Sequence, residues 1–262
     1  MKKPLVSVVI PAYNEEKYIV NCLKSVIVQD FPKNDYEIIV VDNNSTDNTP
    51  GLIKKHFPQV RLVTEKKQGV VFARMKGVTE AKGEIIAFTD ADTLLPPDWL
   101  KKITNAFLDP QIVAVGGYIK MFPQTFLSPF IELTSNLSFS TFKTFSGNNM
   151  AFLKRDYLAC GGFSPKINLA EDAYIASKLK KIGKIKILSD NKILVSSRRS
   201  SLSNYLYFEL KYLIAVFSLL ILKKENFFSF NPIRDRGFLD PPNQKPISSS
   251  KHPNYFLKNK KN

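Results

Sequence analysis

Short apolar runs alternate with longer amphipathic stretches along roughly the first 200 residues of the chain. Apolar runs bounded by polar loops predict strands, and apolar residues recurring every three or four positions predict helices. The pattern predicts strands at 5–11, 37–42, 60–64, 84–89 and 112–121, and helices at 15–28, 47–56, 70–81 and 97–107. This alternation is typical of an α/β fold with a mostly parallel, layered sheet.

Polar residues follow three of the predicted strands at the point where each strand ends. Asp90 and Asp92 follow one apolar run, Asp42 follows another, and Pro11 interrupts the first strand just before Asn14, which we expect to cap the next helix. Because the carboxyl ends of parallel strands meet at one edge of a sheet, these side chains should converge on a single crevice. Such a crevice is typical of a nucleotide site.

The spacing of Asp90 and Asp92 predicts a metal site. In an extended segment, residues two apart point to the same side, so both carboxylates can serve one cation. Mg²⁺ and Mn²⁺ favour oxygen ligands and combine protein carboxylates with substrate phosphates. A solvated acidic turn after a strand is the alternative interpretation.

Six blocks of the sequence, taken in order, resemble the family 2 inverting glycosyltransferases. The blocks are Val6–Glu16, Val40–Thr49, Gly69 with Ala73, Arg74 and Gly77, Gly83–Trp99, Ser146–Arg155, and Gly161–Gly183. The resemblance implies a nucleotide-diphospho-sugar transferase (GT-A) fold with a C-terminal amphipathic helical appendage. It also implies transfer of one sugar, with inversion, from a nucleoside-diphosphate sugar, UDP-sugar favoured, to an acceptor hydroxyl in glycan or cell-envelope assembly.

The resemblance also suggests roles for individual residues. It implies that Asp172 is the general base, and that Asp92 and Asp90 hold the Mg²⁺ or Mn²⁺ ion. Acceptor binding is expected from Gly147, Asn149 and Glu171. Nucleotide and donor binding is expected from Pro11, Ala12, Tyr13, Glu15, Asp42, Arg74, Asp90, Ala91, Asp92, Arg198 and Arg199. For Glu171 and Asp172 the alternative is a capping role at the start of a helix over 172–182. For Arg198 and Arg199 it is ordinary surface charge.

Three departures from the family pattern refine this interpretation. Met75 stands where many relatives have Asn, and we expect it to pack rather than to bind. Tyr174 stands where relatives often carry Asp. The Gln-x-x-Arg-Trp motif of processive synthases is missing from the sequence, which favours addition of a single sugar.

Length and composition set outer bounds on the fold and its compartment. A chain of 262 residues that is 44% hydrophobic can bury the core of one α/β domain with an appendage. Cys22 and Cys160 give no disulfide framework and are most simply buried in a reducing compartment. The first strand begins too close to Met1 to leave room for a signal peptide, so we expect a cytosolic catalytic face.

Most of the net charge of +15 lies after residue 172, beside an apolar stretch at 205–222. Its charge-free part, Tyr212–Leu222, is shorter than the roughly 20 residues that span a bilayer. An interfacial helix with basic flanks on an anionic membrane therefore fits best, with packing against the domain or a membrane span as alternatives. We expect a catalytic domain at 1–200, this helix at 201–225 and an irregular basic tail at 226–262.

The segment 125–145, the two histidines and the lack of a nucleic-acid motif in the sequence also bear on the function. The segment Thr125–Phe145, poor in charge, is either acceptor-side or membrane-facing, or else a core helix. His56 and His252 lack ligand spacing and should lie at the surface. No recognition motif for nucleic acid appears.

Two rival functions remain. One is a haloacid-dehalogenase-type phosphatase, which is disfavoured by Leu94 and by the internal position of the acidic motif. The other is a non-catalytic sugar-nucleotide or lipid-binding relative.

Overall fold

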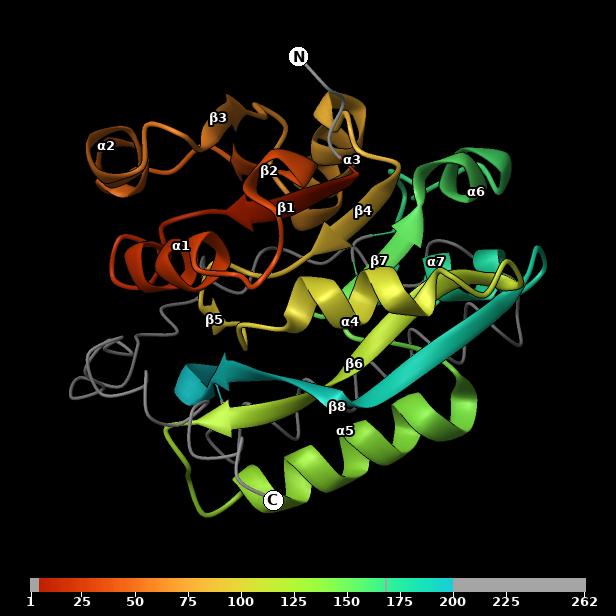
Figure 1. The fold of residues 1–262 in the computed structure, drawn as a ribbon. Coiled ribbons are helices and arrows are strands. Elements are labelled where there is room, and N and C mark those ends of the chain that lie inside the picture. Colours follow the sequence, from red (N-terminus) through yellow and green to blue (C-terminus); the bar gives the residue numbers. More distant parts are fainter. Residues whose placement is uncertain (1–4, 168, 200–262) are drawn as a thin grey trace.

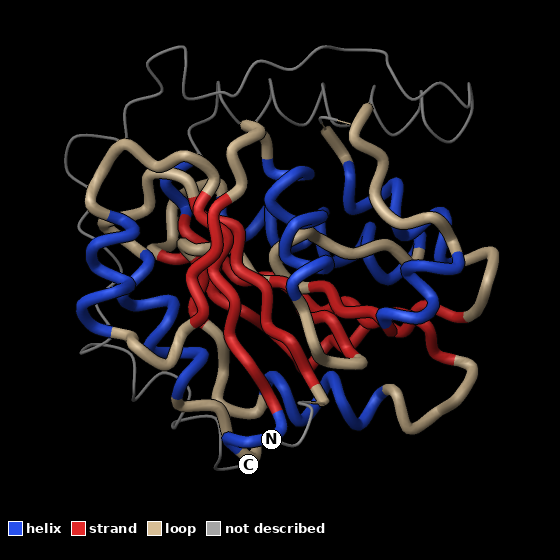
Figure 2. Tube along the Cα trace, turned by 90° about the horizontal axis from the view of Figure 1, so that it is seen from above, coloured by secondary structure: helices blue, strands red, loops and turns tan. Residues whose placement is uncertain are grey.

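The computed structural model describes residues 5–167 and 169–199, which form a twisted eight-stranded sheet with helices on both faces (Figures 1 and 2). The predicted helix at 205–222, the tail at 226–262 and His252 lie outside the described residues. In the ranges that are described, each helix is too short or too polar to cross a bilayer. The α/β class is therefore confirmed, and the domain boundary near residue 200 stays a prediction.

The strands are β1 (Val6–Ala12), β2 (Tyr36–Asp42), β3 (Arg61–Thr64), β4 (Ile85–Phe88), β5 (Thr93–Leu94), β6 (Ile112–Phe122), β7 (Met150–Leu153) and β8 (Lys184–Ser196). The α-helices are α1 (Ile19–Ile27), α2 (Thr49–His56), α3 (Val70–Glu80), α4 (Trp99–Ala106), α5 (Ser128–Phe142), α6 (Lys154–Ala159) and α7 (Glu171–Leu179). Two short 3-10 helices, η1 (Lys33–Asp35) and η2 (Ser197–Arg199), complete the described elements. The strands and helices that the sequence pattern predicts within the described residues are present, with shifted ends.

The sheet is parallel in its first half and mixed in its second. The strand order is β3-β2-β1-β4-β7-β6-β8-β5. All three pairings among β3, β2, β1 and β4 are parallel, as expected for strands joined by helical crossovers. β7 runs antiparallel to both β4 and β6, and β5 runs antiparallel to β8, while β6 and β8 are parallel. The expected layered sheet is thus mostly parallel only on the side that carries β1, β2 and β4.

Two hydrophobic cores fill the space between the sheet and its two helical layers. One core takes side chains from α1, α2, α4 and α5, and the other takes them from α3, α6 and α7. Cys22 is fully buried in the first core, and Cys160 is partly buried beside the second. Met75 also packs against the second core, as predicted. His56 is exposed at the end of α2, again as predicted.

Asn14 does not cap a helix, which corrects the prediction. The helix α1 begins only at Ile19, and Asn14 adopts a left-handed backbone with φ of 55°. Its side-chain oxygen accepts a hydrogen bond from the Thr46 amide at 2.7 Å, and its side-chain nitrogen donates to the Thr46 hydroxyl at 3.1 Å. Asn tolerates this backbone region better than most residues because its short amide can bond locally. Asn14 therefore joins the loops that follow β1 and β2.

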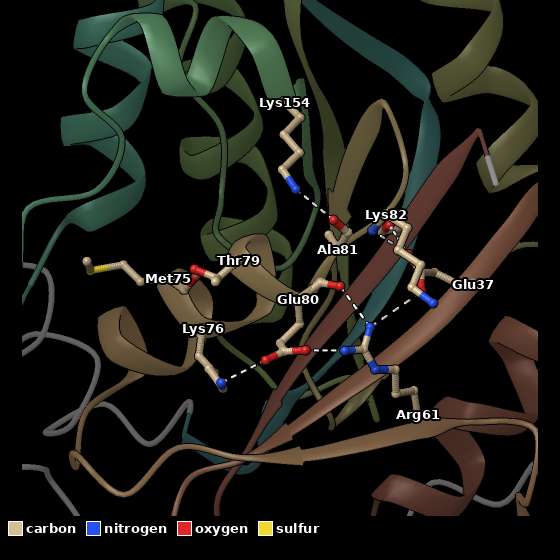
Figure 3. Close-up of polar contacts among 10 residues, drawn as sticks. Glu37, Arg61, Met75, Lys76, Thr79, Glu80, Ala81, Lys82 and Lys154 are labelled. Carbon is tan, nitrogen blue, oxygen red and sulfur yellow. Dashed lines mark hydrogen bonds and ion pairs between the residues drawn. The ribbon is translucent and has the colours of Figure 1, made fainter. Parts of the chain in front are cut away.

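The C-terminal end of α3 is fastened to its surroundings by charged side chains (Figure 3). Arg61 forms an ion pair with the Glu80 carboxylate and donates to the Glu80 carbonyl at 2.8 Å. Lys76 lies 2.7 Å from Glu80 across one turn of the helix, and Lys154 donates to the Ala81 carbonyl at 2.6 Å. These contacts are largely solvent-accessible, so each adds little to stability, and they serve mainly to hold the end of α3 in place.

Close packing of α3 on the sheet depends on Gly77. A Cβ atom at this position would lie 2.2 Å from a methyl group of Val9 on β1. Val9 is completely buried, so its side chain has no free space into which it could turn. Gly77 thus sets the distance between α3 and β1, and through it the position of every side chain that α3 carries.

We predict that Gly77→Ala destabilises the protein by about 1–3 kcal/mol, because overpacking a rigid core outweighs the gain of about 1 kcal/mol in helix propensity. Gly51 on α2 is the matched control, since an added Cβ there meets only the side-chain amide of exposed Asn48, which can turn into water. Gly51→Ala should be neutral or stabilising. Urea unfolding of both variants tests this, and equal effects would contradict the packing argument.

Candidate active site

The carboxyl ends of β1, β2 and β4 meet at one edge of the sheet, as the sequence predicts. Ala12 pairs directly with Asp42 in the parallel ladder, so the two strands end side by side. Both residues are buried, while Pro11 and Tyr13 are half-buried beside them. The Asp42 carboxylate accepts a hydrogen bond from the Ser45 amide at 3.3 Å. The residues expected to receive a nucleobase therefore lie together.

Asn43, which the sequence did not single out, holds the loop before α3 against the end of β2. Its side-chain nitrogen donates to the carbonyls of Glu65 at 2.8 Å and Lys67 at 2.7 Å. Its side-chain oxygen accepts from the Gly69 amide at 2.7 Å. One amide thus ties the end of β2 to the loop that leads into α3. The three backbone partners of Asn43 all lie more than twenty residues away in sequence. The local sequence around Asn43 therefore gives no indication of this role.

Asp90 and Asp92 lie in a turn, so the expectation of an extended segment is wrong. The Thr93 amide donates to the Asp90 carbonyl at 3.2 Å and closes the turn, with Ala91 buried inside it. The Asp90 carboxylate lies 3.2 Å from Arg74, whereas the Asp92 carboxylate lies 2.9 Å from Arg198. Each carboxylate of the acidic motif therefore has its own arginine.

Arg74 is a buried cation at the centre of the site. Its guanidinium forms ion pairs with Asp90 and with Glu171, which begins α7. Burial by itself lowers the pKa of Arg74, but the negative charges of Glu171 and Asp90 outweigh burial and raise it. A Cβ on Gly147 would lie 2.3 Å from this guanidinium, so only glycine fits against it. The expected acceptor residues Gly147 and Glu171 are thus both in contact with Arg74.

Arg198 is buried as well, which removes the surface interpretation for this residue. Its two terminal nitrogens bind the Glu15 carboxylate at 2.8 and 2.7 Å, a bidentate geometry that matches the planar guanidinium. The same guanidinium lies 2.9 Å from Asp92 and stacks 4.5 Å above the Tyr18 ring. Arg198 was expected to contact phosphate, and in this structure its partners are carboxylates. The side chain of Arg199 lies outside the described residues.

Asp172 is held in place by two backbone amides. Gly147 donates to one carboxylate oxygen at 3.1 Å, and Ala173 donates to the other at 2.7 Å. Removal from water, followed by the charge of Glu171, raises the pKa of Asp172 to about 6, although Arg74 and the two amides act in the opposite direction. A carboxylate with this pKa accepts protons more readily than an ordinary aspartate, which suits a general base.

Asn149, which is expected to bind the acceptor, uses its side-chain amide for bonds within the protein. The side chain is 1% exposed. Its oxygen accepts from the indole nitrogen of Trp99 at 2.9 Å, and its nitrogen donates to the carbonyls of Tyr118 and Asn191, both at 3.0 Å. These bonds join α4, β6 and β8 below the site. Gly147, two residues earlier in the chain, is the residue that donates to the Asp172 carboxylate.

The mixed sheet, with its acidic turn after β4 and the carboxylate at the start of α7, belongs to the GT-A class of folds. The chain is a member of glycosyl transferase family 2, whose family model matches residues 7–164. This membership sets aside the phosphatase alternative. Among solved structures, a mannosyltransferase from Pyrobaculum calidifontis, in complex with GDP-Man and Mn²⁺, superposes with a TM-score of 0.72. It shares 26% identity, and the alignment covers 88% of this chain and 66% of that one.

Two further relatives illustrate the range of the family. A dolichyl N-acetyl-α-D-glucosaminyl phosphate 3-β-D-2,3-diacetamido-2,3-dideoxy-β-D-glucuronosyltransferase from Methanococcus voltae is 36% identical over 124 residues, which are 44% of this chain and 39% of that protein. Residues 1–349 of Staphylococcus aureus TarS, in complex with UDP-GlcNAc, match with a TM-score of 0.62 and 25% identity over 82% of this chain and 66% of theirs. The chain spans about two fifths of the length of the first curated relatives that it matches.

We predict that Arg74→Met destabilises the protein by about 3–5 kcal/mol, because it leaves Asp90 and Glu171 without the buried cation that compensates them. Lys76→Met on the same helix removes a cation from a solvent-accessible pair with Glu80 and should cost less than about 1 kcal/mol. Chemical denaturation compares the two. A loss for Arg74→Met no larger than that for Lys76→Met would show that the pairing does not stabilise the site.

Proposed function

We propose that the protein is an inverting glycosyltransferase that moves one sugar from a nucleoside-diphosphate sugar to an acceptor hydroxyl. The observation that carries this proposal is the position of Asp172. Its carboxylate, with a raised pKa, is fixed by the Gly147 amide, and Gly147 packs on the arginine that binds Asp90. A proton acceptor and the acidic motif of a nucleotide site are thus linked through one guanidinium.

The nucleotide of the donor is proposed to bind at the ends of β1 and β2. Asp42 offers an acceptor to the base or ribose, and Ala12 and Tyr13 form the adjacent wall. We favour a UDP-sugar. The two solved neighbours carry GDP-Man and UDP-GlcNAc respectively, so a binding panel should include guanosine as well as uridine nucleotides.

The residues of the acidic turn fit a divalent cation. Asp92, assisted by Asp90, offers hard oxygen ligands of the kind that Mg²⁺ and Mn²⁺ prefer. The described residues hold no group of three acidic, histidine or cysteine side chains that could bind a metal, so we propose that donor phosphates complete the ligand set. When bound, the cation supplies Lewis-acid stabilisation of the departing diphosphate. Asp92 would hold the cation while one of its oxygens lies beside Arg198.

Asp172 is proposed to act as the base in a single displacement. The acceptor oxygen forms a bond to the anomeric carbon while the bond from that carbon to the diphosphate oxygen breaks. The bonding electrons leave with the nucleoside diphosphate, and the hydroxyl proton passes to Asp172. The amides of Gly147 and Ala173 orient the carboxylate so that it need not reorganise during transfer.

The acceptor is proposed to be lipid-linked, with the protein at the cytosolic face of an anionic membrane. The name of the relative from Methanococcus voltae includes a dolichyl-linked sugar phosphate. The apolar stretch at 205–222, followed by Lys223 and Lys224, has the composition of an interfacial helix. Most of the net charge of +15 lies after residue 172, partly before that stretch and partly after it, and this excess of basic residues suits an anionic surface.

We predict that Asp92→Asn abolishes Mn²⁺-dependent binding of the sugar nucleotide and leaves the protein folded. The amide removes the negative charge that the cation needs but keeps the shape of the side chain. Asp98→Asn is the matched control, since Asp98 lies six residues later and pairs with Lys102 at the surface. Calorimetry with UDP- and GDP-sugars, with and without Mn²⁺, provides the measurement. Unchanged donor affinity in Asp92→Asn would refute the metal role.

We predict that Asp172→Asn lowers transfer by about 10²- to 10⁴-fold while donor affinity stays near that of the unaltered protein. Asp190→Asn, at a surface position, serves as the control. Because the base must be ionised, turnover by the unaltered protein should rise about tenfold per pH unit below pH 6 and level off above the pKa of about 6. A donor affinity that falls in parallel with turnover would place Asp172 in donor binding.

The same pKa makes a prediction for stability. A carboxyl group whose folded pKa of about 6 exceeds its ordinary value of 3.8 stabilises the fold fully below pH 3.8, and this contribution is lost as pH rises through 6. Asp172→Asn does not ionise. As pH rises from about 4 to about 7, the variant should therefore become more stable relative to the unaltered protein. Urea unfolding across that range measures the difference. A constant difference would show that Asp172 titrates normally.

A further inference from the structure

The helix α5 carries an apolar stripe on its outer face. Phe126, just before the helix, is 98% exposed, and Phe130, Leu133 and Leu137 are 58%, 66% and 62% exposed. Their spacing of four, three and four residues places them on one side of the helix. We call these four residues the α5 stripe. Soluble proteins rarely expose so continuous an apolar surface unless it binds something.

The stripe is not needed to attach α5 to the sheet, because polar side chains do that. Asn136 both donates to and accepts from the backbone of Ile119, at 3.0 and 2.9 Å. Glu132 accepts from the Met121 amide at 2.8 Å, and Ser140 lies 2.6 Å from the Tyr118 hydroxyl. The helix therefore points its polar residues at β6 and much of its apolar surface outward, the reverse of an ordinary surface helix.

Basic side chains border the α5 stripe. Lys192 of β8 shares an open hollow with Leu133 and Leu137. At the C-terminal end of the helix, a second hollow beside Phe142 is lined by Lys143, Lys180 and Lys184. The single acidic residue of α5 is Glu132, whose carboxylate is already bonded to the backbone of β6. An apolar strip with a cationic border complements a layer of acyl chains beneath anionic headgroups.

The stripe begins at the edge of the sheet that carries the candidate active site. Phe122, at the end of β6, pairs with Ser196 of β8. Arg198, two residues after Ser196, contacts Asp92 of the candidate site. Figure 1 shows α5 along the outer side of β6 and β8. A surface that binds the stripe would therefore lie next to the candidate active site.

We propose that the α5 stripe rests on an anionic lipid surface, with Phe126 and Phe130 inserted among the acyl chains. The inference rests on the proposed lipid-linked acceptor, but it assigns the contact to a helix of the catalytic domain. A second copy of the chain fits less well, because a symmetric pairing of this face would bring two sets of lysines together. Bilayer contact also explains why two phenylalanines remain in water at the edge of the site.

The test uses the full chain with a tryptophan placed on the stripe. Phe130→Trp is mixed with vesicles of phosphatidylglycerol and phosphatidylcholine that carry bromine on their acyl chains, which quench a tryptophan that enters them. Leu158→Trp is the matched control, because Leu158 on α6 is 62% exposed, close to the 58% of Phe130, and lies outside the stripe. The native Trp99 is buried and gives a constant background. We expect quenching of Phe130→Trp alone, weaker with neutral vesicles and at high salt.

A second pair of variants measures binding itself. Leu133→Asp with Leu137→Asp should reduce sedimentation with anionic vesicles at least tenfold, because two apolar side chains leave the bilayer. Leu158→Asp should leave sedimentation unchanged. Circular dichroism confirms that each variant is folded. No donor or acceptor is present, so loss of vesicle binding and loss of sugar transfer are separate outcomes.

Three results would overturn the proposal. Equal quenching at positions 130 and 158, or at neither, would remove the lipid contact. A blue shift of Phe130→Trp without vesicles that grows with protein concentration would identify a second copy as the partner. A blue shift without vesicles that is independent of concentration would show that another part of the same chain covers the stripe.

Discussion

The ion pairs of one buried guanidinium hold the candidate active site together. Arg74 projects from α3 and contacts Asp90 after β4 and Glu171 at the start of α7. Its position is fixed from below, because Gly77 brings α3 close to β1, and from above, because Gly147 has no side chain. A buried cation must be compensated on every side, so the loop after β4, the loop before β7 and the start of α7 all have to adopt positions that suit it.

A second arginine repeats this arrangement on the other side of the acidic turn. Arg198 follows the last strand of the described sheet and binds Glu15, which follows the first strand. Asp92 shares the same guanidinium. The beginning and the end of the described domain are thus joined at the acidic turn, and Tyr18 covers the junction with its ring. A cation at Asp92, as proposed, would therefore act on the contact that joins them.

The sequence predicted the parallel half of the fold and the gathering of polar residues at its edge, because both follow from local periodicity. Apolar runs that end in Asp42 and Asp90 are visible without a structure. The partners of Arg74 and Arg198 were not predictable, since Glu171 and Glu15 lie 97 and 183 residues away in sequence. The turn at Asp90 was missed because an apolar run gives no signal for the residue at which it stops being extended.

The second half of the sheet shows a different limit of sequence patterns. The composition of Thr125–Phe145 was compatible with an acceptor-side or membrane-facing segment or with a core helix, and α5 has both a buried side, with Ile131 and Phe139, and an exposed side, with the stripe. Periodicity identifies the two faces of a helix but does not say which face meets the sheet when polar groups such as Asn136 supply the attachment. The antiparallel direction of β7 likewise depends on its pairing with β4 and β6. That pairing cannot be read from any local segment of the sequence.

The charge of the site constrains the sequence in which ligands can arrive. Five carboxylates, those of Glu15, Asp90, Asp92, Glu171 and Asp172, share the guanidinium groups of Arg74 and Arg198. This group of side chains is therefore negative overall and repels a diphosphate that approaches alone. In the proposed reaction, a divalent cation would therefore have to enter before the sugar nucleotide or together with it. The arrangement of the two arginines thus disfavours free sugar nucleotide as the first ligand.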